Sequence, residues 1–207
     1  MLYPVTDIFR SLQGEGHFVG SPMTFIRLAG CSVLDCAIRS RCDESPWKST
    51  GALRALDILY KCKSYSETGI VCITGGEPTD HDLLPLVVTL RDAGYRVHIE
   101  TSGARSIEGM PLDWITVSPK ARGYKQRMGH VLKLVVLPEW GNVQQSWDHV
   151  QSHDGDYFHR YLQPLSGPDG KPVNLPHVVE MLTGKIGYNA GGRWALSTQA
   201  HKTWGVA

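Results

Sequence analysis

Three cysteines lie within a twelve-residue segment, at Cys31, Cys36 and Cys42. Five charged residues lie within this segment or directly after it, which favours an exposed loop over thiols packed into a core: Asp35, Arg39, Arg41, Asp43 and Glu44. A cubane [4Fe–4S] cluster usually takes four cysteines, so three would leave one iron open to bind a small molecule. A structural zinc site would need a fourth protein ligand, and His17 is the nearest histidine in sequence. The trio predicts an open metal site, with zinc as the alternative.

A second candidate segment is Thr74-Gly75-Gly76-Glu77-Pro78, which directly follows an apolar run. Paired glycines permit a close approach of the backbone to a ligand. The Glu77 carboxylate can accept hydrogen bonds from an ammonium group. An ordinary turn between a strand and a helix is the alternative, so this segment gains weight only from its position after a strand.

The elements that must position these residues alternate along the chain. Short apolar runs predict strands at 23–28, 70–73, 95–99, 114–117, 131–136, 160–162 and 194–197. Helical spacing predicts helices at 51–64, 82–93, 144–152 and 176–186. Alternation of this kind favours a parallel sheet with helices on its faces. We therefore expect one α/β domain over residues 1–207, built as a partial, open parallel barrel of about six strands.

The segments that carry candidate binding residues have the same position in the predicted fold, because each directly follows a predicted strand. They are residues 31–42, 74–78, 100–103, 118–120 and 163–166. In a parallel α/β sheet the carboxyl ends of the strands form the edge at which ligands bind. Five such segments at one edge predict a binding site there.

Composition limits the class of protein. The chain has 207 residues and a formal net charge of +1, so we expect no nucleic-acid partner. No apolar run approaches the roughly 20 residues that span a bilayer, and the N-terminus lacks a signal peptide, so we expect no membrane partner. Five cysteines in a chain of this size favour a reducing compartment. We expect a cytoplasmic protein, in the host cytoplasm if the source is viral.

The cysteine trio after one strand and Gly-Gly-Glu-Pro after the next resemble the radical S-adenosylmethionine (SAM) superfamily. Within it, the chain resembles the 7-carboxy-7-deazaguanine synthases from residue 9 to its end. The resemblance rests on several blocks: Phe9-Arg-Ser-Leu-Gln-Gly-Glu-Gly16, Phe25-Ile-Arg-Leu-Ala-Gly-Cys31, Glu100-Thr-Ser-Gly103, Val117-Ser-Pro-Lys120, Leu132-Lys-Leu-Val135, Leu162-Gln-Pro164 and Leu196-Ser-Thr-Gln-Ala-His-Lys202.

The resemblance implies a reaction and its cofactors. A reduced [4Fe–4S] cluster would cleave SAM to a 5′-deoxyadenosyl radical, which takes a hydrogen from C6 of 6-carboxy-5,6,7,8-tetrahydropterin. Ring contraction and loss of ammonia would give 7-carboxy-7-deazaguanine, with SAM regenerated. The family also implies a Mg²⁺ ion, an electron donor such as flavodoxin or ferredoxin, and a homodimer.

The resemblance also assigns residues. The cluster ligands are Cys31, Cys36 and Cys42, and Glu44 stands where the family has a Mg²⁺ ligand. The SAM-binding residues are Arg41, Asp43, Gly75, Gly76, Glu77, Ser118, Pro119, Lys120, Gln163, Pro164, Leu165 and Ser166. The substrate-binding residues are Leu12, Gln13, Gly14, Glu15, Arg27, Thr74, His201 and Ala207.

Some of these assignments also follow from residue chemistry. The Arg27 guanidinium provides a fork that fits the substrate carboxylate, and it lies four residues before the first cysteine. Gln13 and Glu15 offer an amide and a carboxylate for the donor and acceptor edge of a pterin.

The cysteine loop departs from the common pattern. Its two gaps hold four and five residues, which is longer than in most of the superfamily. Arg41 replaces an aromatic residue, and Glu44 replaces the usual threonine as the Mg²⁺ ligand; a carboxylate is itself a suitable ligand for this ion.

Two alternatives remain open at this point. Another radical SAM enzyme, such as a glycyl-radical activase, would share the cysteines and Gly-Gly-Glu-Pro, although it would not require Gln13, Arg27 and His201. A zinc-stabilised binding module without catalytic activity would account for the cysteines alone.

Overall fold

A computed structural model describes residues 1–42, 49–65, 69–153, 155–185 and 194–206. Asp43, Glu44 and Ala207, which the sequence assigns to the site, lie outside these residues. The described chain forms two compact units, each built from separate stretches of sequence. The first unit comprises Met1–Ser11 and Pro22–Gln126, and the second comprises Leu12–Ser21 and Arg127–Ala207.

The strands of the first unit follow the order β3-β1-β2-β4-β5-β6. Their bounds are β1 Tyr3–Leu12, β2 Pro22–Leu28, β3 Gly51–Leu53, β4 Ile70–Gly75, β5 Arg96–Thr101 and β6 Trp114–Val117. β2, β4, β5 and β6 pair in parallel, and β3 pairs with β1 in antiparallel fashion. The parallel pairing confirms the expectation that the segments after β2, β4, β5 and β6 share one edge.

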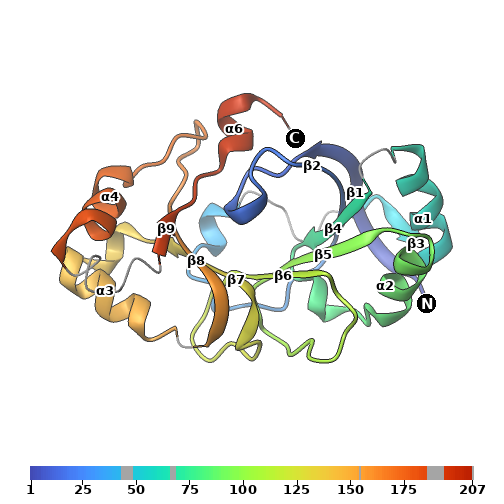
Figure 1. Ribbon diagram of the computed structural model, residues 1–207, viewed down its shortest axis with the longest axis horizontal. Helices are drawn as coiled ribbons and strands as arrows, with labels where there is room; N and C mark the ends of the chain where they lie inside the picture. The colour runs from blue at the N-terminus through green and yellow to red at the C-terminus, as the bar shows by residue number, and fades with distance from the viewer. Residues whose placement is uncertain (43–48, 66–68, 154, 186–193, 207) are drawn as a thin grey trace. The chain divides into compact units, whose positions relative to one another are not determined.

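Two helices cover one face of these strands, α1 Ala55–Ser64 and α2 Leu84–Asp92. Figure 1 shows both helices beside the strands of this unit. Ile58 of α1 and Leu86 of α2 are fully buried against Ile26, Ile73 and Ile99 of the strands. Alternate residues of a strand point to opposite faces. The other face of the same strands therefore presents a different and more polar set.

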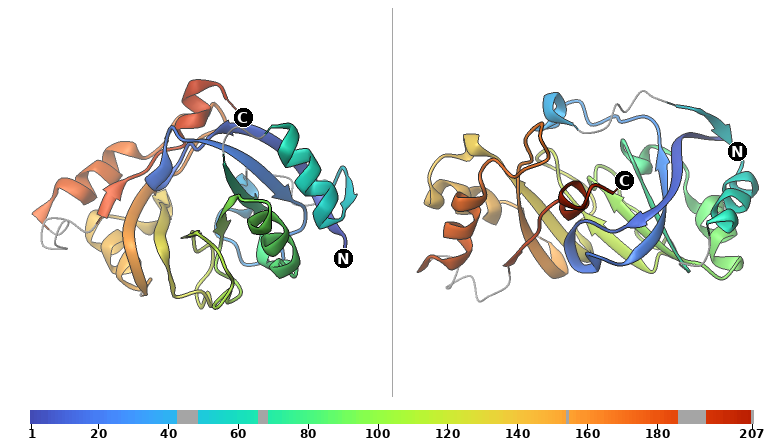
Figure 2. Two further views of the ribbon diagram at one scale, coloured as in Figure 1. Left: turned by 45° about the vertical axis from the view of Figure 1, so that its right-hand side comes forward. Right: turned by 90° about the horizontal axis from the view of Figure 1, so that it is seen from above.

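The second unit has three parallel strands, in the order β7-β8-β9. They are β7 Met128–Val136, β8 Asp156–Pro164 and β9 Trp194–Leu196. Its helices are α3 Val143–Gln151, α4 Leu175–Thr183 and α6 Ala200–Trp204. Both views of Figure 2 show α3 and α4 side by side. Trp147 of α3 is buried between them and donates from Nε1 to the Met181 carbonyl over 3.2 Å.

Short 3₁₀ turns complete the described chain, and three of them lie near candidate residues. They are η1 Gly16–Phe18, η2 Arg39–Arg41, η3 Pro78–Asp80 and η4 Pro138–Trp140. No helix among the described residues is long and apolar enough to cross a membrane.

The structure departs from the sequence prediction at the N-terminal edge. β1 is not expected from sequence, because its buried residues Tyr3, Val5 and Ile8 break strict alternation and Pro4 weakens the strand signal. The predicted helix over residues 51–64 begins only at Ala55, since Gly51–Leu53 form β3 against β1. Tertiary pairing decides the structure of such a short edge segment.

Candidate active site

The cysteine loop leaves the end of β2 and crosses the end of β4 at very short range. A Cβ atom on Gly76 would lie 2.1 Å from the Gly30 carbonyl oxygen and 3.1 Å from Cβ of Cys31. One on Gly75 would lie 2.1 Å from the Leu28 carbonyl oxygen, and Gly75 also has a φ of +146°. The paired glycines therefore let the backbone of β4 pass directly against the first cysteine, which no other residue pair would allow.

The side chain of Glu77 holds the segment that follows β4 in place through hydrogen bonds. This carboxylate is 1% exposed. Its Oε1 accepts hydrogen bonds from the Thr79 backbone at 3.0 Å and from the hydroxyls of Thr79 and Thr101 at 2.7 and 2.6 Å. Its Oε2 accepts from the backbone amide of Ser102 at 2.7 Å and from the Ser102 hydroxyl. Glu77 thus joins the ends of β4 and β5. Its contact with the ammonium group of a ligand stays a prediction.

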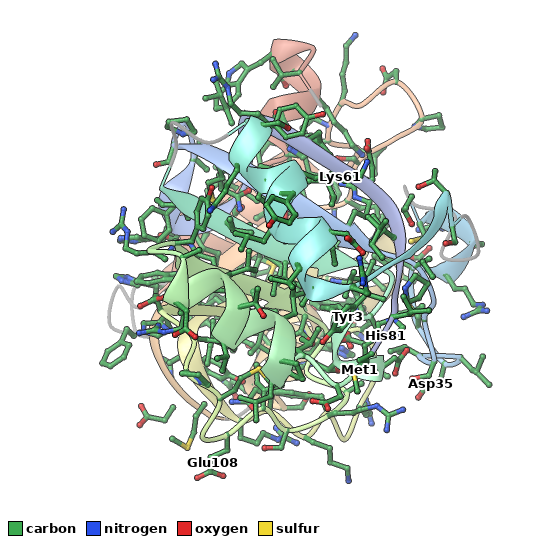
Figure 3. All side chains as sticks on the ribbon, turned by 90° about the vertical axis from the view of Figure 1, so that its right-hand side faces the viewer. Met1, Tyr3, Asp35, Lys61, His81 and Glu108 are labelled. Atoms are coloured by element: carbon green, nitrogen blue, oxygen red, sulfur yellow. The ribbon has the colours of Figure 1, made fainter. Side chains whose placement is uncertain are left out.

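The three candidate cluster ligands form no disulfide in the described structure. Cys31 and Cys36 are half-buried and Cys42 is exposed, as the polar loop between them predicts. Asp35, labelled in Figure 3, lies exposed on this loop. Ser32 ties the loop to Asp80 of η3 through its backbone amide at 2.7 Å and its hydroxyl at 2.5 Å.

Lys120 lies beside the cysteine loop at the end of β6. The Ala37 amide donates to the Lys120 carbonyl over 3.0 Å, and Lys120 Nζ donates to the Ser118 hydroxyl over 2.5 Å. Burial lowers the pKa of Lys120, whereas Cys36, Glu100, Glu77 and Cys42 act to raise it. These groups therefore share one electrostatic neighbourhood in the first unit. A shallow cavity of about 190 Å³ is lined here by residues that include Ser32, Ser102, Lys120 and Tyr124.

The face of the first sheet that points away from α1 and α2 holds further candidates. Arg27 on β2 and Thr74 on β4 are register partners, so their side chains lie on the same face. The Arg27 guanidinium carbon lies 5.4 Å from the centre of the Phe9 ring. Burial raises the pKa of Cys72 on this face, and the nearby charges of Glu100 and Arg27 act on it in opposite directions. The charges of Arg27 and Glu100 therefore both lie near Cys72, on the strands that flank β4.

Glu100 is absent from the residues that the sequence assigns to the site. The structure places this half-buried carboxylate at the end of β5, on the face of Arg27 and Thr74. It begins the strand-end segment 100–103 that the sequence places at the binding edge, although the sequence assigns it no role.

In the second unit, the segment 12–17 holds four predicted substrate residues. Leu12 is exposed, whereas Gln13 is buried. A Cβ on Gly14 would lie 2.0 Å from Nδ1 of His201, and the Ala200 amide donates to the Gly14 carbonyl over 2.9 Å. In Figure 1, α6 lies beside this dark-blue segment. The structure thus brings together two parts of the chain that are almost 190 residues apart, as the resemblance implies.

The loop after β8 lies in the same unit. Gln163 is buried and its Oε1 accepts from the Ser197 hydroxyl over 2.9 Å, while that hydroxyl accepts from the Gly16 amide over 3.0 Å. The Leu165 amide donates to the Asn174 side chain over 2.9 Å. Ser166 forms an isolated bridge with Pro172. These contacts fix the segment 163–166, whose predicted contact with SAM stays a prediction.

No protein-family model matches the chain. Individual known proteins are nevertheless similar to it over its whole length. It is 39% identical over 232 residues to the 7-carboxy-7-deazaguanine synthase of Escherichia coli K12, with all of both chains covered. It is 33% identical to the enzyme of the same name from Synechocystis, over 99% of this chain and 93% of the relative. The crystal structure of QueE from Escherichia coli aligns with a TM-score of 0.73 and 32% identity, covering 97% of this chain and 95% of that one.

The chain belongs to the 7-carboxy-7-deazaguanine synthase family. Membership confirms the resemblance seen in the sequence, and the likeness to QueE confirms the predicted α/β fold class. Because the family uses radical SAM chemistry, a [4Fe–4S] cluster and SAM are the cofactors that the site must fit.

The donor set of the cysteine loop fits such a cluster, because three thiols that form no disulfide in the described structure lie in a loop beside the Gly75-Gly76 crossing. Within the part of the chain that the structure describes, no group of three or more His, Cys, Asp or Glu side chains is close enough to hold a metal ion. Convergence of the three sulfurs is therefore a prediction about the protein with its cluster bound. The predicted Mg²⁺ ligand Glu44 and its neighbour Asp43 lie outside the described residues.

Proposed function

We propose that this chain is a radical SAM enzyme that converts 6-carboxy-5,6,7,8-tetrahydropterin to 7-carboxy-7-deazaguanine with loss of ammonia. The observation that supports this most strongly is 39% identity across the full length of the Escherichia coli synthase. The strand-end loops of the first unit support it independently, because they bring a cysteine trio, paired glycines and a lysine into one neighbourhood.

The cofactors would supply the difficult chemistry, which is formation of a radical able to remove hydrogen from carbon. Cys31, Cys36 and Cys42 would hold the cluster through their thiolates. Gly75, Gly76 and Glu77 would present backbone groups to SAM, because Glu77 holds that segment rigid. Further SAM contacts proposed from the resemblance are Arg41, Asp43, Ser118, Pro119, Lys120, Gln163, Pro164, Leu165 and Ser166.

The substrate would be oriented by charge and by hydrogen bonds. Arg27 would receive the pterin carboxylate, because a guanidinium binds a carboxylate through two parallel hydrogen bonds. Thr74 shares its face and would add a hydroxyl contact. In the second unit, Gln13, Glu15 and His201 would provide donors and acceptors to the substrate. Leu12, Gly14 and Ala207 complete the set proposed from the resemblance.

Other parts of the proposal concern partners. An external reductant, such as flavodoxin or ferredoxin, would supply the electron that the cluster needs. Mg²⁺ would bind near Glu44, whose carboxylate suits a hard cation. We propose a homodimer by analogy with the family, and a reducing compartment such as the cytoplasm because the five cysteines are all free.

Anaerobic reconstitution tests the proposal. The expected result is about four irons and four sulfides per chain, together with pterin-dependent release of ammonia. SAM cleavage with no release of ammonia from the pterin would instead indicate a different radical SAM enzyme. One zinc per chain and no SAM cleavage would indicate a binding module and would overturn the proposal.

A further inference from the structure

Lys133 is a buried lysine in the second unit. It lies in β7 between the buried residues Leu132 and Leu134, and it is 3% exposed. Its ammonium group forms an ion pair with Oε2 of Glu15. Burying an ammonium group is costly unless a partner compensates it, and apolar residues of similar volume often replace such a pair without loss of stability. Stability alone therefore gives no reason for a lysine at this position.

The partner carboxylate is held in a fixed place. The Glu15 amide donates to Oε1 of Gln13 over 3.0 Å, and the next amide, of Gly16, donates to the Ser197 hydroxyl over 3.0 Å. That hydroxyl in turn donates to Gln163 over 2.9 Å. The backbone on both sides of the Glu15 side chain is thus tied down. The side chain itself is 12% exposed, so it is partly accessible.

Lys133 and Glu15 lie beside other groups of the proposed substrate set. Gly14 precedes Glu15 and packs directly on the His201 ring. Lys133 is the register partner of Tyr161, which has Gln163 two residues further along the same face of β8. Four distant stretches of the chain, around Glu15, Lys133, Gln163 and His201, therefore contribute to one polar patch in the second unit.

The chemistry of the pair suits recognition of an N–H-rich edge. An ionised carboxylate offers about four acceptor sites, and Lys133 uses one of them on Oε2. Burial lowers the pKa of Lys133 to about 7, and its ammonium form is the one that pairs with the Glu15 carboxylate. In a pterin, the 2-amino group and the N3–H group are adjacent donors. A carboxylate can accept from both, whereas a 2-oxo ring presents an oxygen that it would repel.

We propose that Lys133 is a positioning residue that keeps Glu15 ionised and oriented toward the 2-amino edge of the substrate. Lys133 thereby determines the preference for a 2-amino-4-oxo ring over a 2-oxo ring. The inference rests on the proposed function and deepens it, because nothing in the cysteine loop or in Arg27 distinguishes these two rings.

The test uses the reconstituted enzyme and two substrates, the carboxytetrahydropterin and its 2-oxo counterpart. Lys133→Met removes the charge at similar volume and should raise the KM for the pterin about 30-fold with a smaller change in kcat. The preference for the pterin should fall about tenfold. Lys133→Arg retains the charge and should restore both quantities to within about threefold of the wild type.

Two further variants show whether Lys133 acts through Glu15. The double variant Lys133→Met with Glu15→Gln should be no worse than Glu15→Gln alone, because the two residues form one unit. Lys171→Met is the matched control. Lys171 also pairs with an acidic residue, Asp169 at 3.8 Å, but its side chain is 83% exposed. This control should leave KM and the substrate preference unchanged.

The outcomes separate the inference from the proposed function. If the wild-type enzyme with its full cluster and bound SAM does not convert the pterin, the proposed function is contradicted. A wild type that turns over the pterin, with a folded Lys133→Met variant of unchanged KM and preference, would overturn the inference. If Lys133→Met does not fold, Glu15→Gln decides, because an unchanged preference between the two rings in that variant also overturns it.

Discussion

The two units differ in how they assemble their candidate groups. In the first unit the groups lie in short contiguous motifs, each at the end of a parallel strand, and the crossing at Gly76 brings them together. In the second unit, Glu15, Lys133 and His201 come from three distant parts of the sequence: Glu15 pairs with Lys133, and its neighbour Gly14 packs on the His201 ring. A motif made from neighbouring residues can be recognised in the sequence, whereas an assembled patch requires the fold.

The largest effect should come from the first unit. Cys36→Ala removes one of three thiolates, so we expect no stable cluster and complete loss of turnover. Iron content and the visible absorption of the reconstituted protein measure this. Cys62→Ala is the matched control, because Cys62 is buried in α1 and has no part in the site. A Cys36→Ala protein with full iron content would show that another ligand set holds the cluster.

Gly76→Ala tests the crossing itself. The added Cβ would lie 2.1 Å from a backbone oxygen, so the β4 end must move away from the cysteine loop. Overpacking of this kind costs about 3 kcal/mol, and SAM binding should be lost with it. Gly20→Ala is the control, because a Cβ there meets nothing within 4 Å and only its φ of +86° opposes the change. Equal denaturation midpoints for the two variants would contradict the steric account.

Arg27→Ala tests the polar face of the first unit. Loss of a charged hydrogen-bonding group should raise the KM for the pterin about 30-fold while iron content stays normal. Steady-state kinetics on the reconstituted protein measure the change. Arg54→Ala is the control, because the Arg54 side chain is 70% exposed and pairs only locally with Asp57 in the described structure. Near-normal turnover of Arg27→Ala at low pterin concentration would remove Arg27 from the substrate site.

The smallest effect is a dependence of stability on pH. Burial raises the pKa of Cys62 to about 12 in the folded protein. In the unfolded chain the pKa of a cysteine thiol is about 8.5. The stabilisation is therefore complete below about pH 8.5 and is lost as the pH rises toward 12. Urea denaturation of the apoprotein at several pH values should show a shallower decline for Cys62→Ala than for the wild type. Identical slopes would contradict the shift.

The candidate groups of the first unit were more predictable from the sequence than those of the second unit. The strand-end segments and the Gly75-Gly76 pair were predictable because apolar runs mark strands and parallel strands share an edge. The pairing of Lys133 with Glu15 was not predictable, since a single charged residue in an apolar strand does not reveal which carboxylate compensates it. Glu100 lies in the predicted segment 100–103, but its place on the face of Arg27 and Thr74 required the strand register. The strands β1 and β3 were not predicted either, because their pairing at the edge of the sheet, rather than a local sequence pattern, forms them.

One measurement tests the central claim most directly. The reconstituted chain is given carboxytetrahydropterin, SAM and a reductant without oxygen, and the product is identified by mass spectrometry. The account predicts 7-carboxy-7-deazaguanine in amounts exceeding the enzyme, dependent on Cys31, Cys36 and Cys42. Unchanged pterin in the presence of a full cluster and bound SAM would contradict it.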